Sequence, residues 1–472
     1  MILDARFPNV SLDRAAQVVI VGAGPVGLTL ASELADVADV LVLEAGGFEN
    51  DNEQQALLSG ECAGLPYPLT ETRARQFGGS SVLWAGYCAQ FDEHDFHVRD
   101  WIPRSGWPFR MEEIQRYYAK VGDLLNLGDA NFDPHDIAKR SGIHVPFDQE
   151  PLLSSVWRFG SPTVRFGDSL RAEFEASTRV TTLVHANVVD IKLSRDRGEV
   201  KEVVIRTVNG RQGRVSLDLC ILACGGLETP RILLNANTQV SQGVGNDTGM
   251  VGRCFMEHPH IPIPSLLITN REMFESWTQR NTYDGSKQFT PTAGLSARVQ
   301  KEAGVGNARV HVYRTPAMNL DETPKVGLFM EQIPNPESRV VLSDTTDRLG
   351  MRRLRLDWRL TDFDWKSYEE TTRLVAEEFV RIGVASLVGP IKPSAPVQNS
   401  VLHSNHQLGT TRMSEDRNEG VVDPNCRVHD LDNLFIIGGS IMPTVSWANP
   451  TFTVLALTLR LADYLRAEVL AQ

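Results

Sequence analysis

The apolar pattern near the N-terminus predicts a strand, a helix and a second strand. Residues 18–21 and 40–43 are short apolar runs, and the segment between them, 25–35, carries apolar side chains at helical spacing. Pro25 suits the first turn of a helix, because its missing N–H removes no intrahelical hydrogen bond. The first forty-odd residues therefore predict a βαβ unit.

The rest of the chain mixes helical and extended patterns. Residues 127–155 are rich in Asp, Pro, Gly and Ser, and they predict a long loop that covers a site. Alternating apolar residues predict a hairpin over 339–360, with its turn at 346–350. The other expected elements are strands at 200–208 and 214–224, and helices at 111–125 and 451–467, the last packing on the nucleotide-binding region.

Three glycines between the first predicted strand and the helix form the pattern GxGxxG. Gly22 permits a tight turn, Gly24 lets the backbone approach a pyrophosphate, and Gly27 lets helix and strand pack closely. The helix N-terminus offers unpaired N–H groups to the phosphates. Glu44 ends the second strand, placed to bind ribose hydroxyls. We therefore predict a bound dinucleotide; a simple strand–helix turn explains the glycines but not Glu44.

Composition narrows the possible partners. The chain of 472 residues is long enough for two structural regions, and its formal charge of −12 argues against nucleic acid. No apolar stretch is long enough to span a bilayer, and the N-terminus lacks the pattern of a secretory signal. The six cysteines show no CxxC pair. We expect a cytoplasmic protein with reduced thiols and no membrane partner.

The continuation of the second strand, 44–47, resembles flavoproteins rather than nicotinamide dehydrogenases. A glycine-containing turn at 221–230 is either a second place where backbone passes close to a cofactor or a simple β–α turn. Five further segments follow in order along the chain: 77–84 (FGGSSVLW), 105–108 (SGWP), 406–413 (HQLGTTRM), 433–440 (NLFIIGGS) and 448–451 (ANPT). Together these motifs span nearly the whole chain and resemble those of the glucose–methanol–choline (GMC) oxidoreductases. The Asn-Pro-Thr ending is most similar to the pyranose-oxidase-like, sugar-oxidising branch.

The resemblance implies an α/β fold in which a Rossmann-like FAD-binding domain is assembled from separated segments. Beside it we expect a substrate domain with a mainly antiparallel sheet and helices. The FAD-binding domain is expected at 1–98, 175–258 and 420–472, and the substrate domain at 99–174 and 259–419.

The resemblance also implies which residues contact FAD. Pyranose oxidases place a flavin-linking histidine one residue before the tryptophan of the first motif, where this chain has Leu83. Because leucine cannot form that bond, we expect noncovalent FAD. The implied contacts are Gly22, Gly24, Gly27, Glu44, Gly79, Ser80, Ser81, Val188, Gly439, Ser440 and Thr451.

The implied chemistry is the oxidation of an alcohol, which removes a proton from oxygen and a hydride from carbon. His406 and Asn449 match the family's catalytic pair, a base and an amide that orients the hydroxyl oxygen. Asn before Pro also shapes turns, which is the competing explanation for Asn449. His403 is a rival base, whereas His258 and His260 indicate a buried structural turn. We expect no metal, because the histidine pairs have no matching carboxylate or cysteine ligands.

We expect the substrate to be a sugar, glycoside or aminoglycoside, the last favoured slightly by the acidic charge. Candidate pocket residues are Trp84, Glu331 and Gln332. Oxygen or another electron acceptor reoxidises the flavin, and the oligomeric state stays open. The alternatives are an NAD(P)H-dependent flavin monooxygenase, a GMC-type lyase, a non-sugar alcohol oxidase and a nonenzymatic flavin-binding protein.

Overall fold

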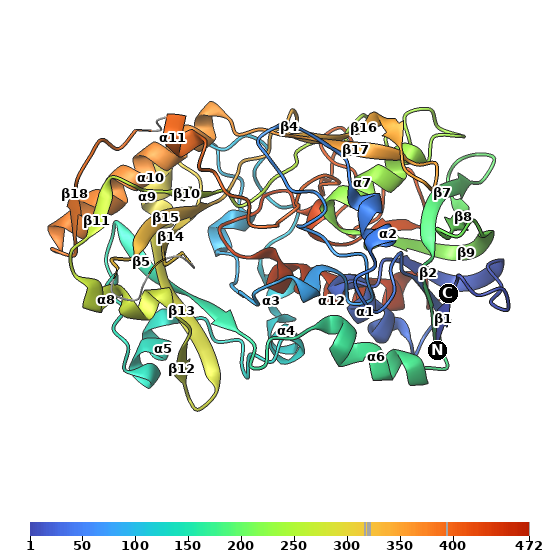
Figure 1. Ribbon diagram of the computed structural model, residues 1–472, viewed down its shortest axis with the longest axis horizontal. Helices are drawn as coiled ribbons and strands as arrows, with labels where there is room; N and C mark the ends of the chain where they lie inside the picture. Colours follow the sequence, from blue (N-terminus) through green and yellow to red (C-terminus); the bar gives the residue numbers. More distant parts are fainter. Residues whose placement is uncertain (316–317, 319–321, 393–394, 472) are drawn as a thin grey trace.

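The predicted βαβ unit lies at the centre of the largest sheet in the computed structural model, which describes residues 1–315, 318, 322–392 and 395–471 (Figure 1). It consists of β2 (Arg14–Val21), α1 (Pro25–Leu34) and β3 (Val40–Leu43). The two strands pair in parallel, with Val18 opposite Val40. All three predicted elements are confirmed.

The sheet has eight strands in the order β1-β6-β3-β2-β9-β8-β7, with β19 beside β9. From β1 to β9 the neighbours are parallel, so their carboxyl ends share one edge, whereas β7, β8 and β9 form an antiparallel meander. The strands not yet bounded are β1 (Ile2–Asp4), β6 (Val180–Val184), β7 (Asn187–Leu193), β8 (Val200–Arg206), β9 (Gln212–Leu222) and β19 (Leu434–Ile436).

Helices cover this sheet and join it to the C-terminus. α12 (Pro450–Tyr464) contacts α1, as predicted, and α6 (Phe166–Ala176) also contacts α1. α7 (Gly225–Asn235) contacts β7 and the predicted hairpin, which is β16 (Arg339–Thr346) and β17 (Arg352–Trp358). β4 (Glu61–Gly64) extends that hairpin in parallel with β17, and the short α2 (Asn52–Gln55) precedes it.

The opposite end of the elongated molecule holds antiparallel strands and most of the remaining helices (Figure 1, left). The mixture of parallel and antiparallel sheets confirms the α/β fold class, while the domain boundaries stay a prediction. The strands are β5 (Leu152–Phe159), β12 (Asn281–Tyr283) and β13 (Lys287–Leu295); β10 (His260–Pro262), β14 (Ala308–Tyr313) and β15 (Lys325–Met330); and β11 (Leu266–Ile268) with β18 (Ala385–Leu387). The helices are α8 (Arg271–Glu275), α9 (Ala297–Ala303), α10 (Asp362–Arg381) and α11 (Ala395–Gln398).

Two expectations in the middle of the chain were wrong. The expected helix at 111–125 is interrupted, forming α3 (Glu112–Gln115) and α4 (Tyr118–Leu124). The expected loop at 127–155 contains α5 (Pro134–Ser141) and the start of β5. The residues that indicated a loop are the ends of α5: the Asp133 carboxylate accepts two backbone N–H groups, and Gly142 ends the helix with φ of 73°.

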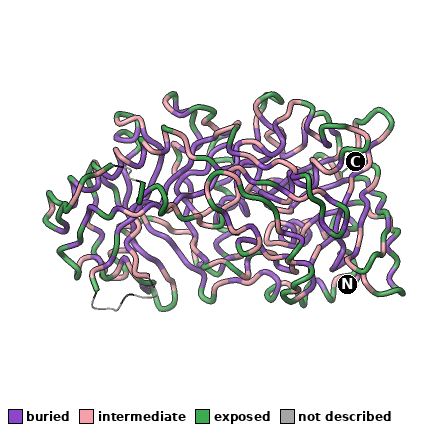
Figure 2. The backbone as a smooth tube through the Cα atoms, turned by 45° about the horizontal axis from the view of Figure 1, so that its top comes forward, coloured by how far each residue is buried: buried purple, intermediate pink, exposed green. Residues whose placement is uncertain are grey.

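The buried residues run through both ends of the molecule without a break at its middle (Figure 2). The largest apolar cluster surrounds the eight-stranded sheet and reaches Trp157 and Phe329 of the antiparallel strands. A second cluster lies between α10 and the strands of the other end. Among the described residues, no helix combines the length and the apolar character needed to cross a bilayer.

Candidate active site

A cavity of about 490 Å³ opens at the carboxyl edge of the parallel strands. Its wall includes Val21, Leu43 and Ala223, which end or follow β2, β3 and β9. Ligands of open α/β sheets bind at this edge, where strand order leaves a crevice. The other wall comes from the C-terminal segments around His406 and Asn449. The cavity therefore joins the predicted nucleotide site to the predicted catalytic pair.

The three glycines of the motif have different surroundings in the structure. Gly22 has φ of +105°, and a Cβ there would lie 2.7 Å from the oxygen of Ala223. A Cβ on Gly27 would lie 1.9 Å from the oxygen of Gly22, so Gly27 allows helix and strand to pack but does not itself line the cavity. Gly24 lines the cavity, and a Cβ there would meet only Gly79 Cα, at 4.0 Å. Only Gly24 therefore has space in front of it for a ligand.

The N-terminus of α1 also fits a phosphate. Gly24 is its N-cap and provides no side-chain acceptor, and Pro25 occupies the first turn. The next backbone N–H groups are thus left without a side-chain cap, and the helix dipole adds a partial positive charge. A pyrophosphate bound at this point would supply the missing acceptors.

Glu44 lies at the end of β3, lines the cavity and is only 5% exposed. Its two carboxylate oxygens accept the backbone N–H groups of Ala23 and Gly46, both at 2.8 Å. Burial raises the pKa of this carboxyl to about 7, while those two donated hydrogen bonds act in the opposite direction. Glu44 thus holds the glycine turn in place, and its contact with a ribose stays a prediction.

The other residues predicted to contact FAD lie around the same cavity, with one exception. Ser440 is fully buried behind the wall, where its carbonyl accepts the N–H of Thr411 at 2.8 Å. Those on the wall are Gly79, Ser80, Ser81, Val188, Gly439 and Thr451.

Sequence reasoning missed a charged cluster on the nucleotide wall. Arg73 and Arg75 both line the cavity and pair with Glu228, at 3.4 and 2.6 Å. Arg231 pairs with Glu228 as well, at 2.7 Å, and with Asp347. Arg73 and Arg75 thus bring positive charge to a part of the wall that also carries the carboxyl groups of Glu44 and Glu228. The signal in the sequence is the pair of arginines a few residues before the Gly-Gly-Ser-Ser segment at 78–81.

His406 and Asn449 meet across the cavity although 43 positions separate them in the chain. The His406 Nε2 and Asn449 Nδ2 atoms lie 3.4 Å apart. Asn449 precedes α12 as its N-cap, but its side chain makes no capping hydrogen bond. Its Oδ1 is buried and has no partner among the described residues. The side chain is therefore not used to shape the turn, which favours the catalytic explanation over the structural one.

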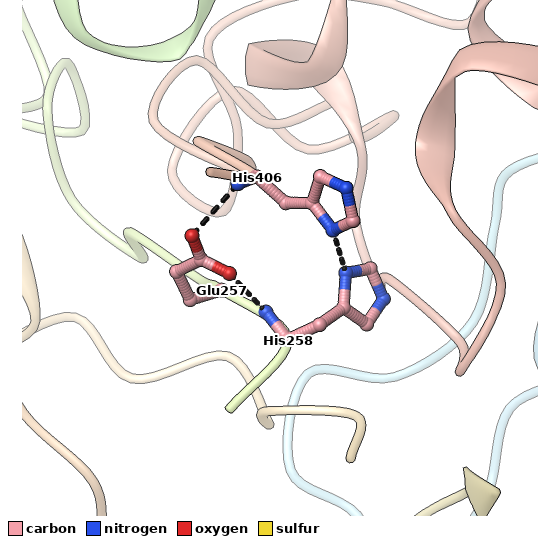
Figure 3. Close-up of side chains that lie close together, drawn as sticks. All are labelled: Glu257, His258 and His406. Atoms are coloured by element: carbon pink, nitrogen blue, oxygen red, sulfur yellow. Dashed lines mark hydrogen bonds between the residues drawn. The ribbon is translucent and has the colours of Figure 1, made fainter. Parts of the chain in front are cut away.

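His258 is buried, as predicted, but it also contacts the proposed base directly. The two Nδ1 atoms of His258 and His406 lie 2.8 Å apart (Figure 3). Glu257 joins both residues, since its carboxylate accepts the N–H of His258 at 2.6 Å and that of His406 at 2.7 Å. The sequence offered one signal, the adjacency of an acid and a histidine in Met256-Glu257-His258, but no spacing related it to His406.

This arrangement overturns the reason for expecting no metal. Ligand atoms of Glu257, His258 and His406 lie within 4.8 Å of one another, so a carboxylate does accompany the histidines. Glu257 is nevertheless saturated: besides the two histidine N–H groups, it accepts the N–H of Ser404 and the hydroxyl of Tyr67. Burial raises the pKa of this carboxyl to about 8. A carboxyl with all its lone pairs engaged is poorly suited to ligate a metal.

Two of the three candidate pocket residues lie elsewhere. Glu331 is 1% exposed and forms a bidentate pair with Arg99, because a buried carboxylate needs a cation. Gln332 is fully buried; its Oε1 accepts the indole N–H of Trp358 at 2.9 Å, and it does not line the cavity. Neither residue lines the cavity, and the structure gives no support to their assignment to the substrate pocket. Trp84 does line the cavity, near Tyr87.

His403, the rival candidate for the base, lies outside the cavity wall. Its ring packs on Tyr67, with centroids 5.0 Å apart. His260 pairs with His311 at 3.2 Å instead of reaching His406. Among the described histidines, His406 is the one on the cavity wall.

Comparison with known proteins relates part of the chain to a family. Residues 334–458, which include His406 and Asn449, match the family model described as GMC oxidoreductase. This segment is therefore similar to the GMC oxidoreductases, which are FAD-binding enzymes that oxidise alcohol groups. FAD is the cofactor.

The known relatives align with this chain over different lengths. The 6'''-hydroxyparomomycin C oxidase of Streptomyces lividus is 24% identical, with 97% of this chain and 93% of that protein aligned. The fructose dehydrogenase large subunit of Gluconobacter japonicus is 27% identical, but the match spans 53% of this chain and only 47% of that subunit. The crystal structure of a formate oxidase has the same fold, with a TM-score of 0.66 at 16% identity over 98% of this chain and 99% of that one.

Leu83 lines the cavity beside Trp84 and is 47% exposed. Because an alkyl side chain forms no bond to the isoalloxazine, we expect acid precipitation of the protein to release all of its yellow colour into the supernatant. The measurement is the flavin absorbance of supernatant and pellet. Colour that stays with the pellet would show a covalent link.

Proposed function

We propose that this protein oxidises a CH–OH group of a sugar, glycoside or aminoglycoside, with His406 as the base and Asn449 as its partner. The observation that carries the proposal is the 3.4 Å approach of His406 Nε2 and Asn449 Nδ2 on the wall of the cavity. One substrate hydroxyl fits both groups, because it donates its proton to Nε2 while its oxygen accepts from the amide.

The surroundings of His406 keep its imidazole in the neutral form, which can accept a proton. Burial is the main cause that holds the pKa of His406 well below its usual value, and His258 adds to the effect. The imidazole is thus neutral at physiological pH. Bound FAD supplies the acceptor for the hydride that leaves the carbon. Asn449 holds the oxygen while His406 Nε2 takes its proton.

This pKa predicts the pH dependence of substrate-driven flavin bleaching. Since the active form of His406 is neutral and its pKa is depressed, the bleaching rate stays constant from about pH 9 down to about pH 6.5 and falls only below that. The measurement is the anaerobic rate at saturating substrate across this range. A rate that rises with pH through a midpoint above about 7 would contradict the assignment.

The substrate class rests on two observations. Trp84 and Tyr87 line the cavity, and aromatic faces provide flat apolar contacts for the carbon side of a sugar ring. Two relatives are named for fructose and for hydroxyparomomycin, an aminoglycoside. The formal charge of −12 favours a cationic aminoglycoside over a neutral sugar.

The experiment that tests the function is anaerobic titration of the yellow protein with sugars, glycosides and aminoglycosides, followed by admission of air. Bleaching by one class establishes alcohol oxidation and names the substrate, and recovery in air identifies oxygen as an acceptor. If only NAD(P)H bleaches the flavin, the protein is a monooxygenase. If a substrate is consumed without bleaching, the lyase explanation replaces oxidation.

A further inference from the structure

We propose that His258 is a positioning residue that fixes the tautomer of His406, so that the lone pair of His406 lies on Nε2 and faces the cavity. The proposal rests on the proposed function, since it concerns the base of that reaction. The tautomer of His406 follows from the hydrogen-bonding partners of the two imidazole rings, first those of the buried His258 and then those of His406.

The inner of the two rings belongs to His258. His258 is fully buried, and its Nε2 lies 3.1 Å from the carbonyl oxygen of Val445 and 3.0 Å from that of Ser446. Carbonyl oxygens only accept hydrogen bonds, so Nε2 of His258 carries the hydrogen. Burial lowers the pKa of His258 to about 4, which keeps the ring neutral. A neutral imidazole protonated at Nε2 has its lone pair on Nδ1.

The outer of the two rings belongs to His406. His258 Nδ1 faces His406 Nδ1 at 2.8 Å, a hydrogen-bond distance. Because the His258 nitrogen is the acceptor, His406 Nδ1 must be the donor. A neutral His406 that is protonated at Nδ1 has its lone pair on Nε2, the atom beside Asn449. The two backbone carbonyls therefore determine, through His258, which nitrogen of His406 acts as the base.

Three segments hold this pair in position. Glu257 accepts the backbone N–H of both histidines (Figure 3). The His258 ring stacks on Phe329, with centroids 5.0 Å apart and planes at 11°. The Ser446 hydroxyl donates to the buried Asp95 carboxylate, which anchors the segment that supplies the carbonyls. That segment continues to Asn449. One stretch of chain thus positions both partners of His406.

The decisive variant is His258→Phe, which preserves the ring that stacks on Phe329 but removes the acceptor. The expected result is retained FAD, a shift of His406 Nε2 toward the protonated form, and flavin bleaching slower by about tenfold or more, because a buried Nδ1–H loses its partner. The tautomer is read by ¹⁵N NMR of histidine-labelled, FAD-loaded protein without substrate. His406→Ala assigns the signals.

Two further variants make the test specific. His258→Asn offers an amide oxygen near the position of Nδ1, and we expect it to restore much of the bleaching rate lost in His258→Phe. His260→Phe replaces another largely buried histidine two residues along, without contact to His406, and should leave both the ¹⁵N signals and the rate unchanged. If the His258→Phe protein does not fold, the wild-type spectrum and His258→Asn still decide the question.

The outcomes separate the tautomer from the function. Wild-type His406 protonated at Nε2, or a His258→Phe protein with unchanged ¹⁵N signals and rate, would overturn the inference. Failure of the proposed function shows differently, since no hydroxylated substrate would then bleach the wild-type flavin. The NMR result stands in either case, because it is recorded without substrate.

Discussion

The His406→Ala variant is expected to remain yellow but to lose a factor of about 10² or more in the rate of substrate-driven flavin bleaching. The imidazole is removed at the point where the substrate proton is accepted, 3.4 Å from Asn449. The glycine turn and Glu44 lie at the other part of the cavity and stay intact, so FAD is retained. The measurement is anaerobic stopped-flow absorbance, together with the flavin-to-protein ratio.

His403→Ala is the matched control for this variant. His403 lies three residues before His406 in the same segment but outside the cavity wall. We expect near-normal bleaching from this protein. Loss of activity in His403→Ala with normal bleaching in His406→Ala would transfer the role of base to His403.

The Gly24→Val variant is expected to fold but to purify without colour. A Cβ on Gly24 meets only Gly79 Cα at 4.0 Å, so the first carbon of the added side chain clashes with no protein atom. It then occupies the space where the turn approaches a pyrophosphate, and it shields the N–H groups of α1. We expect FAD affinity to fall by more than about 10², which corresponds to about 3 kcal/mol. Isothermal titration of the apoprotein with FAD measures the change.

Gly389→Val is the control that tests whether valine at a glycine outside the cavity also lowers the affinity for FAD. A Cβ on Gly389 lies 3.7 Å from Ser265 Cβ, again an ordinary contact, and Gly389 does not line the cavity. This variant should bind FAD normally. A yellow Gly24→Val protein with wild-type affinity would show that the dinucleotide does not approach the turn at Gly24.

The elements that sequence predicted well are those determined by local interactions. β2, α1 and β3 follow from apolar runs and helical spacing, and the roles of Gly22 and Gly27 follow from the steric limits of one tight turn. Prediction failed at α5, because Asp, Pro and Gly cap a short helix as readily as they form a loop.

The catalytic pair depended on a resemblance rather than on spacing. His406 and Asn449 come from segments 43 positions apart, and no periodicity relates them. The resemblance named both, yet it did not reveal Glu257 and His258, which support the base. It also did not exclude Glu331, whose carboxylate is engaged by Arg99 in the interior.

The sequence by itself thus determined the βαβ unit and, through short motifs that resemble those of a known family, the cofactor class; His406 as the base stays a proposal. Only the tertiary structure decided which buried groups meet, since a hydrogen bond between His258 and His406 requires two distant segments to be brought to 2.8 Å. The physical reason is that a buried polar group needs a hydrogen-bond partner. The packing of the whole chain, and not the local sequence around that group, determines which partner lies beside it.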